Sequence, residues 1–201
     1  MRPFNISRVI VCCLVACGAF FVATNQAKAD LIYTITGVGS NIGDSALVGF
    51  NESFTVVFEV DDSVVDANSS SPEFGQYLDA IRSSSISFSG GYSSIDDFVG
   101  GEVIVSTANP GGGVAFGSAD NENALTLFNV ESVIATDDLV AGSQELATLP
   151  LDFVGALTSE DGGIVFVTSS VELTVSSVPE PTSLGLLGLG LVVASVRRRR
   201  K

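Results

Sequence analysis

The sequence predicts an all-β fold, most simply an antiparallel two-sheet sandwich of the jelly-roll type, with a small barrel as the nearest alternative. Two observations lead to this prediction. Apolar and polar residues alternate in about eight short runs across the middle of the chain, and Gly, Asn, Asp and Ser separate these runs. Alternation with a period of two indicates strands with one buried face, and the separating residues favour tight turns.

The clearest strand lies near residues 53–60, where Phe54, Val56, Phe58 and Val60 share one face. An Asp-Gly pair at 161–162 predicts a tight hairpin between two later runs. Further strands are predicted at residues 31–35, 86–88, 101–107, 113–118, 124–130, 146–157, 163–169 and 171–175.

One segment departs from the alternation and predicts a short helix near 72–82, packed on an edge of the sandwich. Its apolar residues recur at helical spacing, Ser71 can cap its start, and Pro72 suits a first helical turn. The apolar positions are Phe74, Tyr77, Leu78 and Ile81. We expect this apolar stripe to belong to the core.

The N-terminal residues 1–29 have the pattern of a signal peptide, with a basic start, an apolar stretch and a small-x-small cleavage site. Cleavage by signal peptidase between Ala29 and Asp30, with Ala27 as the other small residue, would remove this signal helix. An uncleaved anchor helix is the alternative. Residues 14–17 also resemble a lipobox, which would place a lipid on Cys17, although the apolar run continues past that cysteine.

Charge is distributed very unevenly along the chain. All but one of the 23 acidic residues lie between residues 30 and 178, where Arg82 is the only base, so this region carries a net charge of −21. Such a surface repels nucleic acid and anionic lipid, which excludes nucleic acid as a partner. High negative charge also keeps an extracellular β-protein soluble.

Pairs of acids in predicted loops could collect Ca²⁺, which prefers hard oxygen ligands. No loop matches the D-x-D-x-D-G pattern, so the alternative interpretation is that these acids lie in solvated turns. Ca²⁺ is the only cofactor that the sequence suggests. The candidate ligands are Asp61, Asp62, Asp120, Glu122, Asp137 and Asp138.

Catalytic chemistry is restricted by residue supply. Residues 30–178 contain no His, Cys, Lys or Trp, which excludes Ser-His-Asp and Cys-His catalysis, Schiff-base chemistry and zinc held by His or Cys. A pair of carboxylates could still serve a glycosidase, but among so many acids a pair has no diagnostic value. We therefore expect a protein that is not an enzyme.

The C-terminal residues 184–196 form an uncharged apolar stretch rich in glycine. A helix of this length spans roughly 20 Å, less than the ~30 Å hydrocarbon core, so it predicts a marginal hydrophobic helix that stops transfer. The basic cluster after it holds the end on the cytoplasmic side. That cluster comprises Arg197, Arg198, Arg199, Arg200 and Lys201.

The motif Val178-Pro179-Glu180-Pro181, followed by the apolar helix and the arginine cluster, resembles the PEP-CTERM sorting signal of exosortase substrates, a tail also described for ice-binding proteins. The resemblance implies export, transient anchoring in the inner membrane, processing by an exosortase, and delivery to the cell surface, outer envelope or extracellular matrix of a Gram-negative bacterium. The expected organisation is a signal peptide (1–29), an acidic β-domain (30–177) and a sorting signal (178–201).

For function, we expect a non-enzymatic structural or adhesive role linked to exopolysaccharide or biofilm. The alternative is a Ca²⁺-dependent module that binds carbohydrate or another ligand. Ice binding is not expected, because it usually requires a regular array of threonines and Thr34 and Thr36 form an isolated pair.

Overall fold

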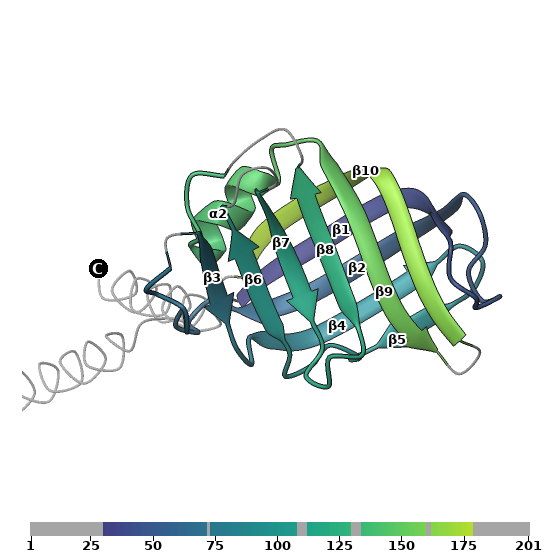
Figure 1. Cartoon of the computed structure of the whole chain (residues 1–201), viewed down its shortest axis with the longest axis horizontal. Helices are drawn as coiled ribbons and strands as arrows, with labels where there is room; N and C mark the ends of the chain where they lie inside the picture. Colours follow the sequence, from purple (N-terminus) through teal and green to yellow (C-terminus); the bar gives the residue numbers. More distant parts are fainter. Residues whose placement is uncertain (1–29, 72, 108–111, 130–133, 160–161, 179–201) are drawn as a thin grey trace, which may run out of the picture. The chain divides into compact units, whose positions relative to one another are not determined.

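Ten antiparallel strands and one short helix account for most of the described residues, which confirms a mainly β fold (Figure 1). The alternation at residues 53–60 and most of the other predicted runs do form strands. The elements are β1 Asp30–Asn41, β2 Glu52–Asp61, β3 Phe74–Tyr77, β4 Ile81–Phe88, β5 Ser93–Ile95, β6 Glu102–Ser106, β7 Gly112–Gly117, β8 Ala124–Asn129, α2 Leu139–Leu146, β9 Leu151–Ser159 and β10 Gly162–Val178.

The structure, a computed structural model, describes residues 30–71, 73–107, 112–129, 134–159 and 162–178. These fall within one compact unit, Asp30–Val178. The predicted signal helix and the predicted C-terminal hydrophobic helix lie outside the described residues.

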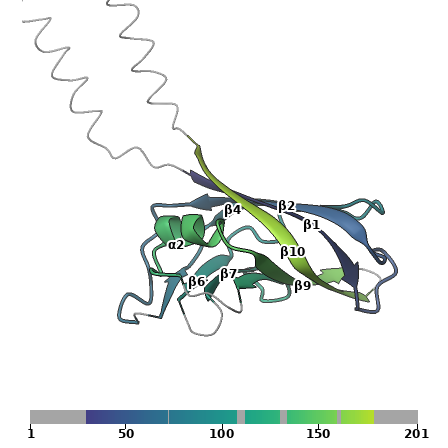
Figure 2. The same cartoon turned by 90° about the horizontal axis from the view of Figure 1, so that it is seen from above.

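The strands form one continuous sheet with the order β3-β6-β7-β8-β9-β10-β1-β2-β4-β5. This sheet curls so that β6–β9 face β1, β2 and β4 across the core (Figures 1 and 2). The long strand β10 joins the two layers, because it pairs with β9 of one layer and with β1 of the other. The layers are also joined where Ala80 N–H donates to Gly101 O (3.0 Å) and Gly100 N–H to Ile81 O (2.9 Å). The arrangement is therefore closer to the barrel alternative than to a jelly-roll sandwich of two separate sheets.

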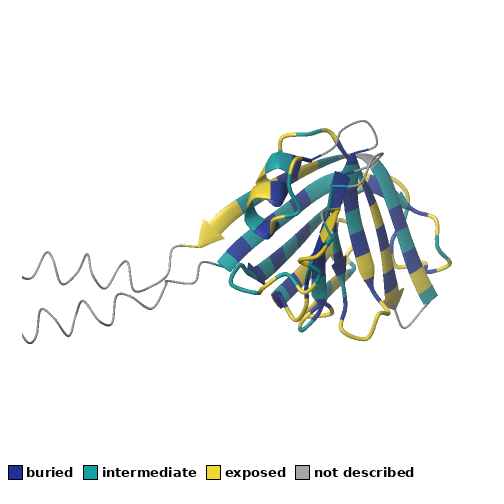
Figure 3. Ribbon diagram, turned by 60° about the vertical axis from the view of Figure 1, so that its left-hand side comes forward, coloured by how far each residue is buried: buried dark blue, intermediate teal, exposed yellow. Residues whose placement is uncertain are grey.

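The core fills the space between the two layers, and buried residues alternate with exposed ones along the strands (Figure 3). Aromatic rings from both layers meet there. Phe58 of β2 stacks on Phe116 of β7 with ring centroids 4.1 Å apart, and Tyr33 of β1 meets the same ring edge-on at 5.1 Å. Such pairs add to the free energy gained from apolar burial, so the inward faces hold the curled sheet together.

The helix predicted near 72–82 was wrong. Residues 74–77 form β3, paired with β6, and a turn then leads into β4 at Ile81. Gly75 lowers the helix propensity of the segment, and Asp79 adopts a left-handed conformation (φ 54°) that interrupts helical geometry. Strand pairing therefore outweighed the helical spacing of the apolar residues, and Phe74 points outward instead of into the core.

Among the described residues, the structure has one helix, α2, which the sequence analysis did not predict. Asp138 Oδ1 accepts hydrogen bonds from the N–H groups of Val140 and Ala141, which caps its start. Its buried residues are Leu139, Gly142, Ser143 and Leu146. The predicted strand at 146–157 therefore begins only at Leu151, because its first residues finish this helix and its connection to β9.

The strand that ends the described domain is a single long element. The two predicted strands at 163–169 and 171–175 are both part of β10, which bends at a register shift between Thr168 and Val171. The β9–β10 hairpin is confirmed by pairing of Ser159 with Gly162. At the other end of β10, Val178 pairs with Asp30, so the first and last described residues are neighbours.

Candidate ligand-binding cleft

An open cleft with a volume of about 350 Å³ lies where three loops meet at one edge of the domain. The loops are the turn from β3 to β4, the connection from β5 to β6, and the connection from β7 to β8. Small-molecule sites commonly occupy about 300–1,000 Å³, so the cleft has room for a small ligand. It is lined by Leu78, Asp79, Gly100, Gly101, Glu102, Ser118, Ala119 and Asn121.

The floor of the cleft depends on a close approach of two strands at Gly101. A Cβ at this position would lie 2.0 Å from the carbonyl oxygen of Gly117, so only glycine fits. Beside it, Gly100 has a φ of +73°. Asp79 and Asn121 (φ 54° and 61°) also adopt the left-handed conformation, which Asp and Asn tolerate better than other residues with side chains.

The β7–β8 loop is held by its own side chains. Ser118 Oγ accepts a hydrogen bond from Asn123 N–H (2.9 Å) and donates to Asp120 Oδ1 (2.5 Å), which also accepts from Glu122 N–H (3.0 Å). The hydrogen bond from Ser118 is the main reason that the pKa of the Asp120 carboxyl is lowered. These contacts fix the loop that presents Asn121 to the cleft.

The polar groups of the cleft suit a ligand with several hydroxyl groups. Glu102 receives a hydrogen bond at Oε2 from Gln76 Nε2 (2.6 Å), which orients its carboxylate. Asp79 lines the same cleft, and carboxylates form strong hydrogen bonds with hydroxyl donors. Asn121 adds an amide that can donate and accept. Leu78, with half of its side chain exposed, adds an apolar surface.

The six predicted calcium ligands lie in three different parts of the chain. Asp61 and Asp62 lie where β2 ends, Asp120 and Glu122 in the β7–β8 loop, and Asp137 and Asp138 before α2. Across the described ranges, no three His, Cys, Asp or Glu side chains gather in a way that could hold a metal ion. Calcium binding therefore stays a prediction without a defined site.

Besides Asp120, the acids Asp61 and Asp138 use their carboxylates in structural contacts. Desolvation opposes ionisation of Asp61, but hydrogen bonds from Ser63 and Arg82 outweigh it and lower the Asp61 pKa to about 2. The carboxylate of Asp138 caps α2, whereas Asp137 uses its backbone carbonyl to accept a hydrogen bond from Tyr77 Oη (3.0 Å).

The predicted processing sites lie at the boundary of the described domain. Asp30 begins β1, and its carboxylate oxygen Oδ1 lies 3.2 Å from Arg82 Nε. Val178 ends β10, and the other predicted residues of both sites lie outside the described residues. These are Ala27, Ala29, Pro179, Glu180, Pro181, Arg197, Arg198, Arg199 and Arg200.

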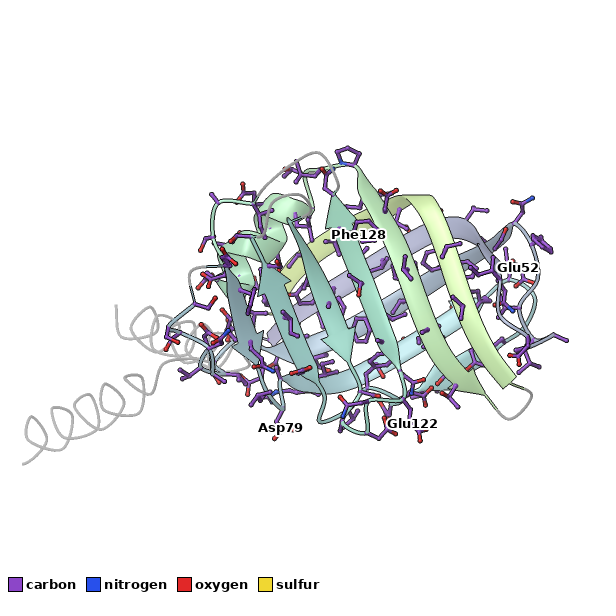
Figure 4. All side chains as sticks on the ribbon, in the orientation of Figure 1. Glu52, Asp79, Glu122 and Phe128 are labelled. Atoms are coloured by element: carbon purple, nitrogen blue, oxygen red, sulfur yellow. The ribbon has the colours of Figure 1, made fainter. Side chains whose placement is uncertain are left out.

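Sequence reasoning missed the cleft residues Asp79, Glu102 and Asn121. Each lies in or beside a turn with a visible Asp, Asn or Gly signal, but the three turns are far apart in the chain. Figure 4 shows Asp79 and Glu122, from two of these loops, along the same lower edge of the domain. Only the pairing of β3 with β6 and of β6 with β7, together with the hydrogen bond from Ala80 N–H to Gly101 O, brings the turns together.

The fold and the cleft define a β-domain with an open polar site on its surface. Comparison with known proteins shows how the protein is sorted. Residues 177–200 match the family model of the PEP-CTERM protein-sorting motif. The chain is therefore a protein with a PEP-CTERM sorting motif, which implies export, transient anchoring in the membrane and processing by an exosortase. No curated protein and no solved structure matches the chain. Within the ranges that the structure describes, no helix is long and apolar enough to cross a membrane.

Proposed function

We propose that this protein is a non-enzymatic component of the cell surface or extracellular matrix that adheres to exopolysaccharide through the cleft at the β3–β4, β5–β6 and β7–β8 loops. The observation that carries the proposal is the lining of this cleft. It combines two carboxylates, an amide and an apolar side chain in a space suited to a sugar. The sorting motif supports it, because the motif implies export and its resemblance to exosortase substrates implies a bacterium that makes exopolysaccharide.

The non-enzymatic part of the proposal is supported by the composition of residues 30–178. Without His, Cys or Lys, this region has no ordinary nucleophile-base pair. The cleft carboxylates can accept hydrogen bonds from sugar hydroxyls. A role in biofilm or matrix cohesion follows if such binding holds polymer to the exported protein.

The test is binding of the purified exported protein to a glycan array, followed by calorimetry on the strongest hits. We expect Asp79→Asn to weaken binding about tenfold, because it removes a charge-assisted acceptor. Asp152→Asn on β9 makes the same chemical change on the outer face of the sheet and should leave the affinity unchanged. Binding to no glycan, or equal effects of the two variants, would refute the proposal.

A chelator arm distinguishes the calcium-dependent alternative. If the cleft binds sugar through its own side chains, EDTA should leave the affinity unchanged. Loss of binding in EDTA that Ca²⁺ restores would instead favour a module in which calcium joins protein and sugar.

A further inference from the structure

A second surface feature lies at the opposite end of β4 from the cleft. It is a groove of about 220 Å³ between the start of β2 and the end of β4, and we refer to it as the hydroxyl groove. Its lining consists of Ser53, Phe54, Thr55, Ser87, Phe88 and Ser89. Phe54 and Phe88 are buried, so the exposed and half-exposed side chains that it offers are all hydroxyls.

An exposed aromatic ring stands close to this groove along the chain. Phe50 is 80% exposed. Among the exposed apolar residues of the described ranges, no other aromatic side chain is exposed to this extent. It precedes Ser53 by three residues, which span at most about 10 Å. Exposing a Phe forgoes roughly 1.5–3 kcal/mol of burial free energy, and it leaves the ring available to stack on a ligand.

The loop that carries Phe50 is well anchored. On one side, Gly49 N–H donates to Glu52 Oε1 (2.8 Å), and on the other, Asn51 N–H donates to Ser40 Oγ (3.2 Å). Glu52 Oε2 also accepts from Gly90 N–H (3.0 Å), which joins this loop to the β4–β5 turn beside the groove. Figure 4 shows Glu52 at the end of the domain away from Asp79. The ring is thus presented by hydrogen-bonded backbone on both sides.

The chemistry of the hydroxyl groove differs from that of the rest of the domain. The domain carries a net charge of −21, yet none of the six lining residues is charged. The nearby Glu52 directs both carboxylate oxygens to backbone N–H groups of the two loops. A ligand recognised here would therefore be uncharged, rich in hydroxyl groups, and possess an apolar face for an aromatic ring.

We propose that the hydroxyl groove and Phe50 form a second saccharide-binding site, specific for neutral glycans. One sugar ring of the glycan stacks on Phe50, while hydroxyl groups of the same glycan exchange hydrogen bonds with Ser53, Ser87 and Ser89. This inference rests on the proposed function, because it assumes that the domain encounters extracellular polysaccharide.

Two sites on one domain have a mechanical consequence. The cleft and the groove flank opposite ends of β4, whose eight residues separate them by about 23 Å. A protein with two glycan sites at this separation can hold two polymer chains, or two parts of one chain, at once. Bivalent attachment raises the apparent affinity for a polymer well above that for a short oligosaccharide.

The test uses the exported protein with dextran, xylan and soluble β-glucan as neutral polymers and alginate as an anionic one. We expect Phe50→Ser to weaken binding of a neutral polymer about fivefold or more. Val65→Ser is the control, since Val65 is equally exposed (81%) in a different loop. In NMR titrations, the amide signals of Ser53, Ser89 and Gly90 should shift with the neutral polymer and not with alginate.

The possible failures are distinguishable. The second site is refuted, while the proposed function stands, if Asp79→Asn weakens binding but Phe50→Ser does not. In that case the NMR amide signals of Ser53, Ser89 and Gly90 should not shift when the polymer is added. Equal binding of alginate at the groove would refute its selectivity for neutral glycans. Binding to none of the four polymers would overturn this inference, and binding to no member of the glycan array would overturn the proposed function as well.

Discussion

Arg82 Nη2 lies 2.6 Å from Asp61 Oδ2, so the only basic residue between residues 30 and 178 joins β4 to β2. The same guanidinium reaches Asp30 through Nε, which adds β1 to the contact. The hydrogen bond to Asp61 is the main reason that the Arg82 pKa is raised. In a domain with such an excess of acids, this one base relieves repulsion at the point where the domain begins and three neighbouring strands meet.

This contact predicts a defined pH dependence. Because folding lowers the Asp61 pKa from 3.8 to about 2, ionised Asp61 stabilises the fold above about pH 4, and that contribution is lost as the pH falls towards 2. Asp61→Asn should therefore reduce the free energy of unfolding by about 1 kcal/mol at pH 7 and by much less near pH 2, since the pair is partly exposed. Urea titrations across this range measure the difference. A constant difference between wild type and variant would contradict the assignment.

The cap of α2 supplies a prediction with a matched control. Asp138→Ala removes the carboxylate that accepts from Val140 and Ala141 and should cost about 1 kcal/mol of stability. Asp137→Ala makes the same change one residue earlier, where the protein uses the backbone carbonyl, and should cost much less. Thermal unfolding followed by circular dichroism compares the two. Similar losses for both variants would show that the Asp138 cap is not responsible for the effect.

Close packing beneath the cleft can be tested with two neighbouring glycines. Gly101→Ala would place a methyl group 2.0 Å from Gly117 O, so we expect a loss of about 2 kcal/mol or more as the strands separate. Gly117→Ala is the control, because its nearest neighbour is the side chain of Glu102 at 3.5 Å. Chemical denaturation gives both values. If the two variants are equally stable, the approach of Gly101 to Gly117 does not shape the cleft.

A large part of the strand pattern could be predicted from the sequence, because alternation depends on local spacing alone. The segment at 72–82 shows the limit of this reasoning. Its apolar residues satisfy helical spacing, yet Gly75 and Tyr77 face the core from a strand because β6 offers hydrogen-bond partners along its edge. The opposite error occurred at Leu139–Leu146, where an Asp cap and buried residues three and four apart were present but overlooked.

The sequence by itself determined the alternating strands, the extreme acidity of residues 30–178 and the C-terminal sorting motif, since each is a property of adjacent residues. The tertiary structure decided that the strands curl as one sheet, that Arg82 bridges Asp30 and Asp61, and that Asp79, Glu102 and Asn121 share a cleft. Those features depend on which strands pair and in which register. Pairing is set by many simultaneous long-range contacts in the core, and no short stretch of sequence contains that information.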